Sequence, residues 1–434
     1  MENKVVIYWF RRDLRTEDNK GLQQALASGL PVVPIFIFDT ELLNQLSDPY
    51  DRRVDYIHQA LISINETLHQ YQSTLQVYHG KPLEVFKKII TQYQIQAVYC
   101  NRDYEPQAIK RDQIVQTFLE QHAIHFYDFK DQVIFDQSEI VKADGLPYTV
   151  YTPYAKKWRT EIKPEHYTTA KTDLSNFYKT APQEILSLSD IGFKKTDMLF
   201  RKPEPDFEII KDYTLYRDFP ALDKTSHLGI ALRFGTISIR ECVSFALRHN
   251  DTWLSELIWR EFFMQILYHF PKVVHHSFKA QYDYIEWRNN EEEFQLWCKG
   301  ETGYPIVDAG IRQLNSTGFM HNRVRMIVAS FLCKHLLIDW RWGEAYFAEK
   351  LLDYDLSANN GNWQWAAGSG CDAAPYFRIF NPTAQTQKFD KDLLYIKKWN
   401  PDFQQDIMPP IVQHEEARQR ALQVYKKAIE NFNK

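Results

Sequence analysis

The run Val5–Phe10 contains six consecutive aliphatic or aromatic residues. Such an uninterrupted run is typical of a strand that is buried on both faces of a sheet. Pro31–Phe38 and Ala97–Cys100 have the same character, and Asp51–Gln70 and Lys81–Thr91 carry apolar residues at helical spacing. Strands that alternate with helices predict an α/β domain, a parallel sheet with helices on both faces.

The turn after the first predicted strand, Arg11–Arg15, contains no glycine. The phosphate-binding G-x-G-x-x-G loop is therefore absent from this turn. We expect no dinucleotide to bind there.

The second half of the chain differs chemically from the first, because nine of the eleven tryptophans lie from Trp253 onward. Trp253–Phe270 reads as a helix with Trp253, Leu257 and Ile258 on one face. Pro305 and Gly318 are typical of the start and the end of another helix. We predict an α/β domain over 1–130, a long connection over 131–202 and an all-helical domain over 203–434.

Composition limits the functional class. The five cysteines are dispersed without CxxC pairs, which indicates reduced thiols and no zinc site. No apolar run approaches a membrane span and the start lacks a signal peptide, so we expect a cytoplasmic protein. The formal net charge is −4, so a nucleic-acid-binding chain of this kind must gather its positive charge on one face.

The segment Leu351–Trp365 concentrates two carboxylates, two adjacent amides and two tryptophans, at Asp353, Asp355, Asn359, Asn360, Trp363 and Trp365. One interpretation is a helix end and a turn whose tryptophans fill the core. The other is a flavin site. A flavin has an imide N–H that needs an acceptor and an N5 that gains a proton on reduction, and a carboxylate and an amide meet these needs.

Two further segments carry polar groups. Thr225–Leu228, continuing to Phe234–Ser238, offers hydroxyls at helix starts, which bind phosphate or simply cap a helix. Thr302–Gly310 runs on to Met320–Met326, which contains Asn322, Arg323 and Arg325.

Together these segments resemble the photolyase/cryptochrome family, and within it the bacterial class I cyclobutane pyrimidine dimer photolyases. The resemblance runs from Trp9–Arg15 through Tyr151–Pro153 to Phe377–Pro382, and Trp253–Phe262 and Asp355–Trp365 are its most specific parts. It implies a carbon–carbon lyase that repairs cyclobutane pyrimidine dimers in DNA with light. Fully reduced FAD would pass an electron to a flipped-out dimer. The family also implies a monomer that binds no metal ion and does not associate with a membrane.

The resemblance assigns the FAD site residue by residue. Its phosphates would be held by Thr225, Ser226, Leu228 and Ser238, with Tyr213 as a further cofactor-binding residue upstream. Gly229 stands where many relatives have serine. The rest of the cofactor would be lined by Trp253, Arg260, Asn322, Arg325 and Asp353, with Asp355 at the imide edge and Asn359 at N5.

The resemblance also assigns substrate and electron-transfer residues. Glu256 would hydrogen-bond the dimer, and Trp259 and Trp365 would form the walls of its cavity, with Asn322, Arg323 and Met326 at the mouth. Arg217, Arg323, Arg378 and Lys388 would grip phosphates. An electron would reach the flavin through Trp287, Trp340 and Trp363. Without the resemblance, Met326 and Trp259 could be simple core residues of a helix. Trp287, Trp340 and Trp363 would then be more typical of core or surface aromatic residues.

Three rival functions are weighed against repair of this dimer. Cryptochromes replace the amide at Asn359, and six-four photolyases carry histidines at Asn322 and Met326, so both are disfavoured. A non-catalytic flavin- or nucleotide-binding module would not need Glu256 or Trp365.

A second, antenna chromophore is common in the family. Asn101, Tyr104 and Glu105 match a folate-type antenna site, but Val274 stands where a lysine often completes it. The antenna would therefore be a folate, a deazaflavin, a flavin, or absent.

Overall fold

The computed structural model describes residues 4–169, 171–405 and 408–433. They form two compact units. The first comprises residues 1–136, 161–205 and 227–248, and the second comprises 137–160, 206–226 and 249–434. The predicted connection, 131–202, thus supplies residues to both units, and the predicted domain boundaries at 130 and 202 stay predictions.

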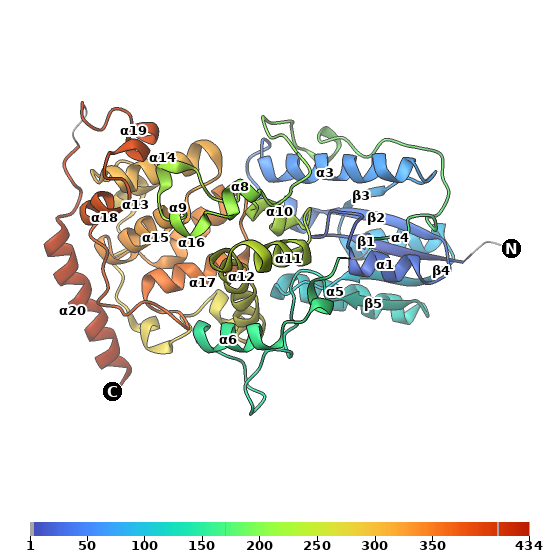
Figure 1. Cartoon of the computed structure of the whole chain (residues 1–434), viewed down its shortest axis with the longest axis horizontal. Coiled ribbons are helices and arrows are strands. Elements are labelled where there is room, and N and C mark those ends of the chain that lie inside the picture. Colours follow the sequence, from blue (N-terminus) through green and yellow to red (C-terminus); the bar gives the residue numbers. More distant parts are fainter. Residues whose placement is uncertain (1–3, 170, 406–407, 434) are drawn as a thin grey trace. The chain divides into compact units, whose positions relative to one another are not determined.

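The first unit contains a five-stranded sheet in the order β3-β2-β1-β4-β5, with every neighbouring pair parallel (Figure 1). The prediction of a parallel sheet is confirmed. The sequence analysis does not predict the edge strands β3 and β5, because both are half-exposed and mix polar with apolar residues. The strands are β1 (Val5–Phe10), β2 (Val32–Asp39), β3 (Gln76–Gly80), β4 (Ile95–Asn101) and β5 (His125–Phe129).

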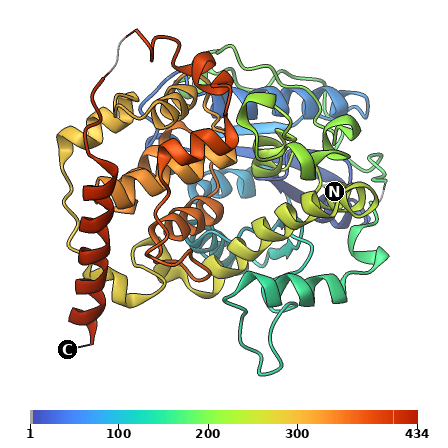
Figure 2. The same cartoon turned by 60° about the vertical axis from the view of Figure 1, so that its left-hand side comes forward.

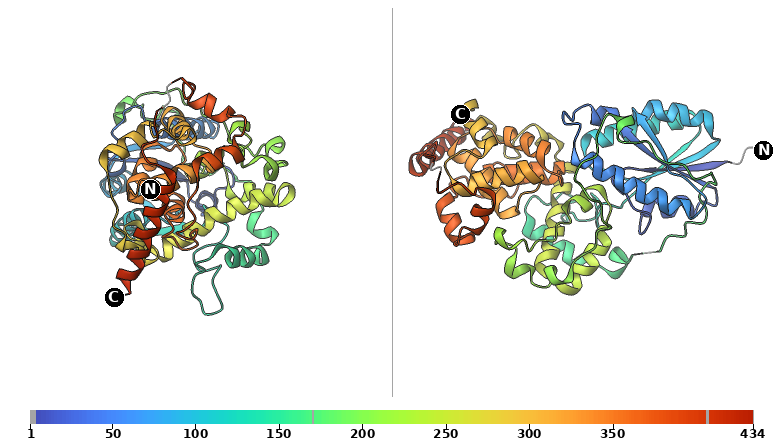
Figure 3. Two further views of the ribbon diagram at one scale, coloured as in Figure 1. Left: turned by 90° about the vertical axis from the view of Figure 1, so that its left-hand side faces the viewer. Right: turned by 90° about the horizontal axis from the view of Figure 1, so that it is seen from above.

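Helices cover both faces of the sheet, as the turned view in Figure 3 shows. Side chains of β1 alternate between two apolar clusters: Val6, Tyr8 and Phe10 pack with α1 and α3, and the intervening residues pack with α4 and α5. The helices that lie in this unit are α1 (Lys20–Leu26), α2 (Thr40–Leu43), α3 (Arg52–His69), α4 (Pro82–Gln92), α5 (Pro106–Gln121), α7 (Pro164–Tyr167), η1 (Ser189–Ile191), α10 (Gly229–Phe234) and, but for its last residue, α11 (Ile239–His249).

The second unit is helical, and every β-strand assigned within the described residues lies in the first unit. Trp253, Leu257 and Ile258 are buried on α12, as predicted. Its longest helices are α12 and α20, and α20 runs along one side of this unit (Figure 2). The helices are α6 (Tyr151–Glu161, all but its last residue), α8 (Phe207–Ile210), α9 (Tyr213–Tyr216), η2 (Pro220–Leu222), α12 (Asp251–His269), η3 (Pro271–Val274), η4 (Ala280–Tyr284), α13 (Glu291–Lys299), α14 (Pro305–Thr317), α15 (Asn322–Ser330), the π-helix η5 (Phe331–His335), α16 (Trp340–Lys350), α17 (Leu356–Ala367), α18 (Pro382–Phe389), α19 (Leu394–Trp399) and α20 (His414–Phe432).

The helix boundaries follow local rules. Pro305 begins α14, and Gly318 ends it with a φ of 71°, the left-handed conformation that glycine adopts without strain. Both boundaries confirm the prediction.

The five cysteines are free thiols, and Cys100, Cys242 and Cys333 are buried. No helix in the described part of the chain is long and apolar enough to cross a membrane. Within the same residues, no group of three or more His, Cys, Asp or Glu side chains could hold a metal ion.

The contact between α16 and α17 depends on a glycine. A Cβ atom added at Gly343 would lie 2.1 Å from Cη2 of Trp363 and 2.6 Å from Cδ2 of Leu332. Both neighbours are themselves buried, at 2% and 0% exposure, so neither has space to move into.

We therefore predict that Gly343→Ala destabilises the protein by about 1–3 kcal/mol, because overpacking outweighs the better helix propensity of alanine. Thermal unfolding followed by circular dichroism checks this. Ala345→Ser, on the exposed side of the same helix, is the control and should change stability by less than about 0.5 kcal/mol. An unchanged or higher Tm for Gly343→Ala would contradict the packing described.

A lysine is buried in the second unit. Lys334 of η5 is 1% exposed, its Nζ donates to the carbonyl of Tyr376 at 3.1 Å, and it lies 3.9 Å from the ring centre of Tyr425. No carboxylate pairs with it among the residues described. Burial lowers the pKa of this amine to about 7.

The lowered pKa has a definite sign for stability. Between pH 7 and the ordinary lysine pKa of about 10.4, the unfolded chain binds the proton and the folded chain does not, so stability rises with pH over this window. We predict that Lys334→Met raises the Tm relative to the parent protein more at pH 6 than at pH 10. Equal shifts at both pH values would show that Lys334 is not desolvated.

Candidate functional site

The first turn of α17 positions a carboxylate and an amide. Asp355 caps the helix, and its Oδ1 accepts from the backbone N–H groups of Ser357 at 3.1 Å and Ala358 at 3.3 Å. Asn359 follows one turn later, and its amide nitrogen donates to the carbonyl of Glu344 at 3.0 Å. Trp363 follows after one more turn. The spacing of four residues places all three on one side of the helix.

Glu344 is a residue of this region that the sequence patterns do not single out. Its Oε1 is buried and has no hydrogen-bond partner among the described residues. Burial raises the pKa of its carboxyl group to about 7, against the opposing effect of a hydrogen bond with Asn360. The residue whose backbone carbonyl holds the Asn359 amide thus carries a carboxyl group that is easily protonated at neutral pH.

The three tryptophans of the predicted electron path belong to one apolar cluster. Trp363 and Trp340 are 2% and 1% exposed. Trp287 is half-buried and packs edge-on against Tyr425 at 6.1 Å. Trp363 also has Trp297 as a ring neighbour, at 6.3 Å between centroids, which the sequence patterns do not indicate.

An ion pair joins α15 to the segment before α17. The guanidinium of Arg325 donates to both carboxylate oxygens of Asp353, at 3.0 and 3.2 Å. Its Nε donates to the carbonyl of Met320 at 2.7 Å, which fixes the side chain. These two residues are the pair that the resemblance places beside the flavin.

The residues predicted to hold phosphates are divided between the two units. In the second unit, the hydroxyl of Thr225 is buried without a partner among the described residues, and Ser226 follows it. In the first unit, Leu228 is buried before α10, whose first residue is the exposed Gly229. The hydroxyl of Ser238 donates to Asp18 in that unit.

Four charged side chains of the second unit are linked in a row, with positive and negative charges alternating. Arg217 donates to Glu256, and its Nε lies 3.9 Å from Asp218, which accepts from Arg323 at 2.7 Å. Arg217 also covers the ring of Tyr213, with 5.6 Å between the guanidinium carbon and the ring centre. Burial raises the pKa of Glu256, and Arg217 opposes this rise. The sequence patterns did not single out Asp218, although it directly follows Arg217.

Two aromatic side chains stack at the middle of α12. The ring of Trp259 lies parallel to that of Tyr151, with centroids 3.6 Å apart and planes inclined by 5°. Trp259 lies three residues after Glu256 and therefore on the same side of the helix. Trp253 is buried, whereas Arg260 and Trp365 are half-buried.

The predicted mouth of the cavity is polar and partly exposed. Asn322 is the exposed first residue of α15, and the sulfur of Met326 lies 3.6 Å from Nη1 of Arg323. Arg323 and Lys388 both lie over the ring of Phe389, at 4.4 and 5.1 Å. Arg378 is exposed. Cations gathered around an aromatic ring suit a nucleic-acid surface.

The predicted antenna residues lie in the first unit. The amide nitrogen of Asn101 donates to Tyr8 at 2.9 Å and to Asp13 at 2.6 Å, and its oxygen accepts from the backbone of Gly21. Glu105 accepts from Arg12 at 2.8 Å and Arg233 at 2.6 Å. Both side chains therefore already form hydrogen bonds with other residues of this unit. Val274 is the last residue of η3, which belongs to the second unit.

The donors and acceptors of the second unit fit a flavin dinucleotide. The unpartnered Thr225 hydroxyl suits a phosphate oxygen, and the Asp355 carboxylate and Asn359 amide suit the polar edges of the ring system. The Arg325–Asp353 pair adds a fixed charge pair to the same unit.

Comparisons with known proteins agree with this chemistry. Residues 6–173 match the family model of DNA photolyase, and residues 253–406 match that of the FAD binding domain of DNA photolyase. The deoxyribodipyrimidine photo-lyase of Synechococcus sp. is 39% identical, over 92% of this chain and 88% of the relative.

Solved structures match as well. A bacterial class III photolyase from Agrobacterium tumefaciens has a TM-score of 0.85 and 32% identity, over 99% of this chain and 98% of that one. An archaeal photolyase from Sulfolobus tokodaii with two FAD molecules has a TM-score of 0.83 and 33% identity, over 97% of this chain and 99% of that one. The chain therefore belongs to the DNA photolyase family.

Proposed function

We propose that this protein repairs cyclobutane pyrimidine dimers in DNA with light, with fully reduced FAD as its catalytic cofactor. The observation that carries the proposal is the position of Glu256. This carboxyl group is held by Arg217 and lies on the same side of α12 as the stacked indole of Trp259. A base that leaves the duplex would find a hydrogen-bonding group and an aromatic face together.

The cofactor would be held by the residues that the resemblance assigns to it. Thr225, Ser226, Leu228 and Ser238 would bind the phosphates, with Tyr213 nearby, and Asp355 would accept from the imide N–H. Asn359 would orient its amide toward N5, while Trp253, Arg260, Asn322, Arg325 and Asp353 would line the rest. When bound and excited by light, the reduced flavin supplies the electron that opens the cyclobutane ring and receives it back.

Glu256 would act on the dimer itself. Its raised pKa favours a protonated carboxyl group, which donates a hydrogen bond to a pyrimidine carbonyl. Such a bond becomes stronger as negative charge develops on the pyrimidine, so it stabilises the reacting state more than the ground state. Trp259 and Trp365 would replace the base stacking lost on flipping, next to Asn322 and Met326.

DNA phosphates would be bound by the cations around this row of charged side chains, namely Arg217, Arg323, Arg378 and Lys388. Trp287, Trp340 and Trp363 would carry an electron inward to reduce an oxidised flavin. Their exposure supports this order, because Trp287 is the most exposed of the three and Trp363 lies one turn from Asn359.

We propose a monomer that acts in the cytoplasm without a metal ion. An antenna chromophore at Asn101 and Glu105 stays a prediction, and extraction followed by mass spectrometry would identify it as a folate, a deazaflavin or a flavin. Membership of class I also stays a prediction, since a class III photolyase is among the matching structures.

The repair reaction is tested with chemically reduced holoenzyme and an oligonucleotide that carries one thymine dimer. We predict that thymine absorbance returns under blue light and not in darkness. Glu256→Ala should slow the ring-splitting step by about tenfold, equivalent to the loss of ~1.4 kcal/mol from one strong hydrogen bond, and thereby lower the repair yield per absorbed photon. Glu291→Ala, an exposed carboxylate on α13, is the control. Absence of repair by fully reduced holoenzyme would refute the proposal.

The tryptophan path is tested separately. Trp340→Phe should slow light-driven reduction of the oxidised flavin by at least about tenfold, because phenylalanine is far harder to oxidise, while repair by chemically reduced enzyme persists. Absorbance at flavin wavelengths during illumination with an external reductant measures the first rate. Equal photoreduction in the parent and Trp340→Phe proteins would exclude Trp340 from the path.

A further inference from the structure

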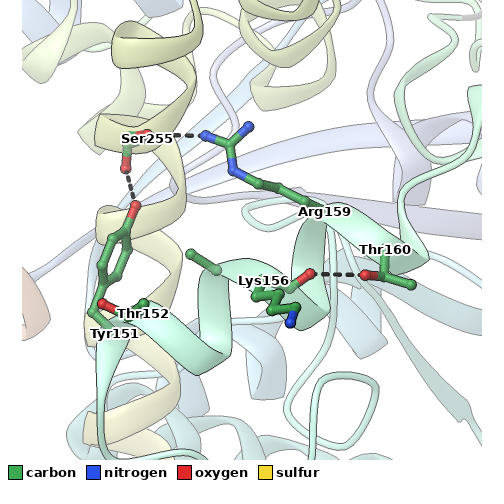
Figure 4. A pocket seen from close by; sticks show the side chains of 7 residues that line it. Tyr151, Thr152, Lys156, Arg159, Thr160 and Ser255 are labelled. Atoms are coloured by element: carbon green, nitrogen blue, oxygen red, sulfur yellow. Dashed lines mark hydrogen bonds between the residues drawn. The ribbon is translucent and has the colours of Figure 1, made fainter.

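A groove of about 460 Å³ opens between α6 and α12 of the helical unit, and its lining is unlike that of a core cavity (Figure 4). One side of α6 supplies most of the wall, because its lining residues recur at intervals of four. The labelled lining residues are Tyr151, Thr152, Lys156, Arg159, Thr160 and, from α12, Ser255.

The groove is lined by two cationic side chains, Lys156 and Arg159, and only Arg159 is paired with a carboxylate. Arg159 pairs with Asp251 at 2.5 Å and donates to the hydroxyl of Ser255 at 2.9 Å. Lys156 is exposed, and its ammonium group makes no ion pair or hydrogen bond with the residues that the structure describes. One full positive charge is therefore available to an anion.

The groove is connected to the predicted dimer site through Tyr151. This ring forms one wall of the groove and stacks on Trp259, with 3.6 Å between the centroids. Its hydroxyl donates to the carbonyl of Ser255, the residue before Glu256. Lys156 lies on the same helix as Tyr151, about 7.5 Å further along its axis, so a strand whose base lies near Trp259 would bring a neighbouring phosphate toward Lys156.

We propose that this groove binds one backbone phosphate of the damaged strand next to the dimer, with Lys156 as its main contact. The proposal rests on the proposed function. Lys156 would neutralise the phosphate, and the exposed hydroxyl of Thr152 would donate to one of its oxygens, whereas the hydroxyl of Thr160 already donates to the carbonyl of Lys156 at 2.9 Å. Contacts of this kind set register without reading sequence, which suits an enzyme that must recognise damage in any sequence.

The experiment measures binding of the holoenzyme to dimer-containing DNA over a range of salt concentrations. Lys156→Ala should weaken binding roughly 3- to 10-fold at physiological salt and lower the slope of log K against log salt by about 0.9, the value of one phosphate contact in a duplex. Lys156→Arg should restore both. Lys426→Ala, which removes an exposed lysine from α20, is the matched control and should change neither.

A second set of oligonucleotides locates the phosphate. Each carries one neutral methylphosphonate linkage at a defined position beside the dimer. At one position the neutral linkage should weaken binding by the parent protein and have no effect on binding by Lys156→Ala. Equal losses for both proteins at every position would overturn the proposal, as would unchanged binding by Lys156→Ala.

The outcomes separate this proposal from the proposed function. Parent protein that binds dimer DNA without light-driven repair would refute the function, while the Lys156 comparison still reports on the groove. Repair by the parent protein with no effect of Lys156→Ala on binding would refute the groove alone. Stabilisation of the parent protein by inorganic pyrophosphate, lost in Lys156→Ala without any change in DNA affinity, would assign the groove to a small anion instead.

Discussion

The capping of α17 by Asp355 is the interaction on which the candidate site depends most. The cap fixes where the helix begins, and the spacing of four residues then places the Asn359 amide and the Trp363 indole on the same side. Asn359 is held by the carbonyl of Glu344, and Trp363 packs on the bare backbone of Gly343. Because both partners lie on α16, the two helices orient the polar and the aromatic group as one rigid assembly.

A second constraint is electrostatic. Glu256, Arg217, Asp218 and Arg323 alternate in sign, so each cation is shared between two carboxylates or held by one. An incoming phosphate would compete with these carboxylates for the arginines. A phosphate that draws Arg217 away from Glu256 would remove the cation that opposes the raised pKa of this carboxyl group, which favours its protonated form.

The parts of the fold that the sequence predicts are those with a strong local signal. The strand Val5–Phe10 is buried on both faces, so its unbroken apolar run predicts a strand without any knowledge of the neighbouring strands. In contrast, β3 and β5 lie at the sheet edges and mix polar with apolar residues. The helical unit was predictable for the same reason, since Trp253, Leu257 and Ile258 of α12 are buried at helical spacing and α14 begins with proline and ends at glycine.

The site could be predicted only in part. Resemblance supplied the identities of Asp355, Asn359 and Glu256, and the structure shows the contacts that orient them. The stacking of Tyr151 on Trp259, the link through Asp218 and the buried Glu344 depend on segments far apart in the sequence, so no local pattern could reveal them. For the antenna residues, the sequence indicates a motif but not the contacts. Asn101 and Glu105 match the motif, and in the structure both side chains form hydrogen bonds with residues of the first unit.

The proposed repair reaction requires the bound dimer to accept an electron from the light-excited cofactor. The most direct measurement is the fluorescence of the reduced holoenzyme as dimer-containing DNA is added. We expect fluorescence to fall in proportion to the bound dimer and to stay constant with an undamaged oligonucleotide of the same sequence. Fluorescence that does not change when dimer DNA saturates the protein would contradict it.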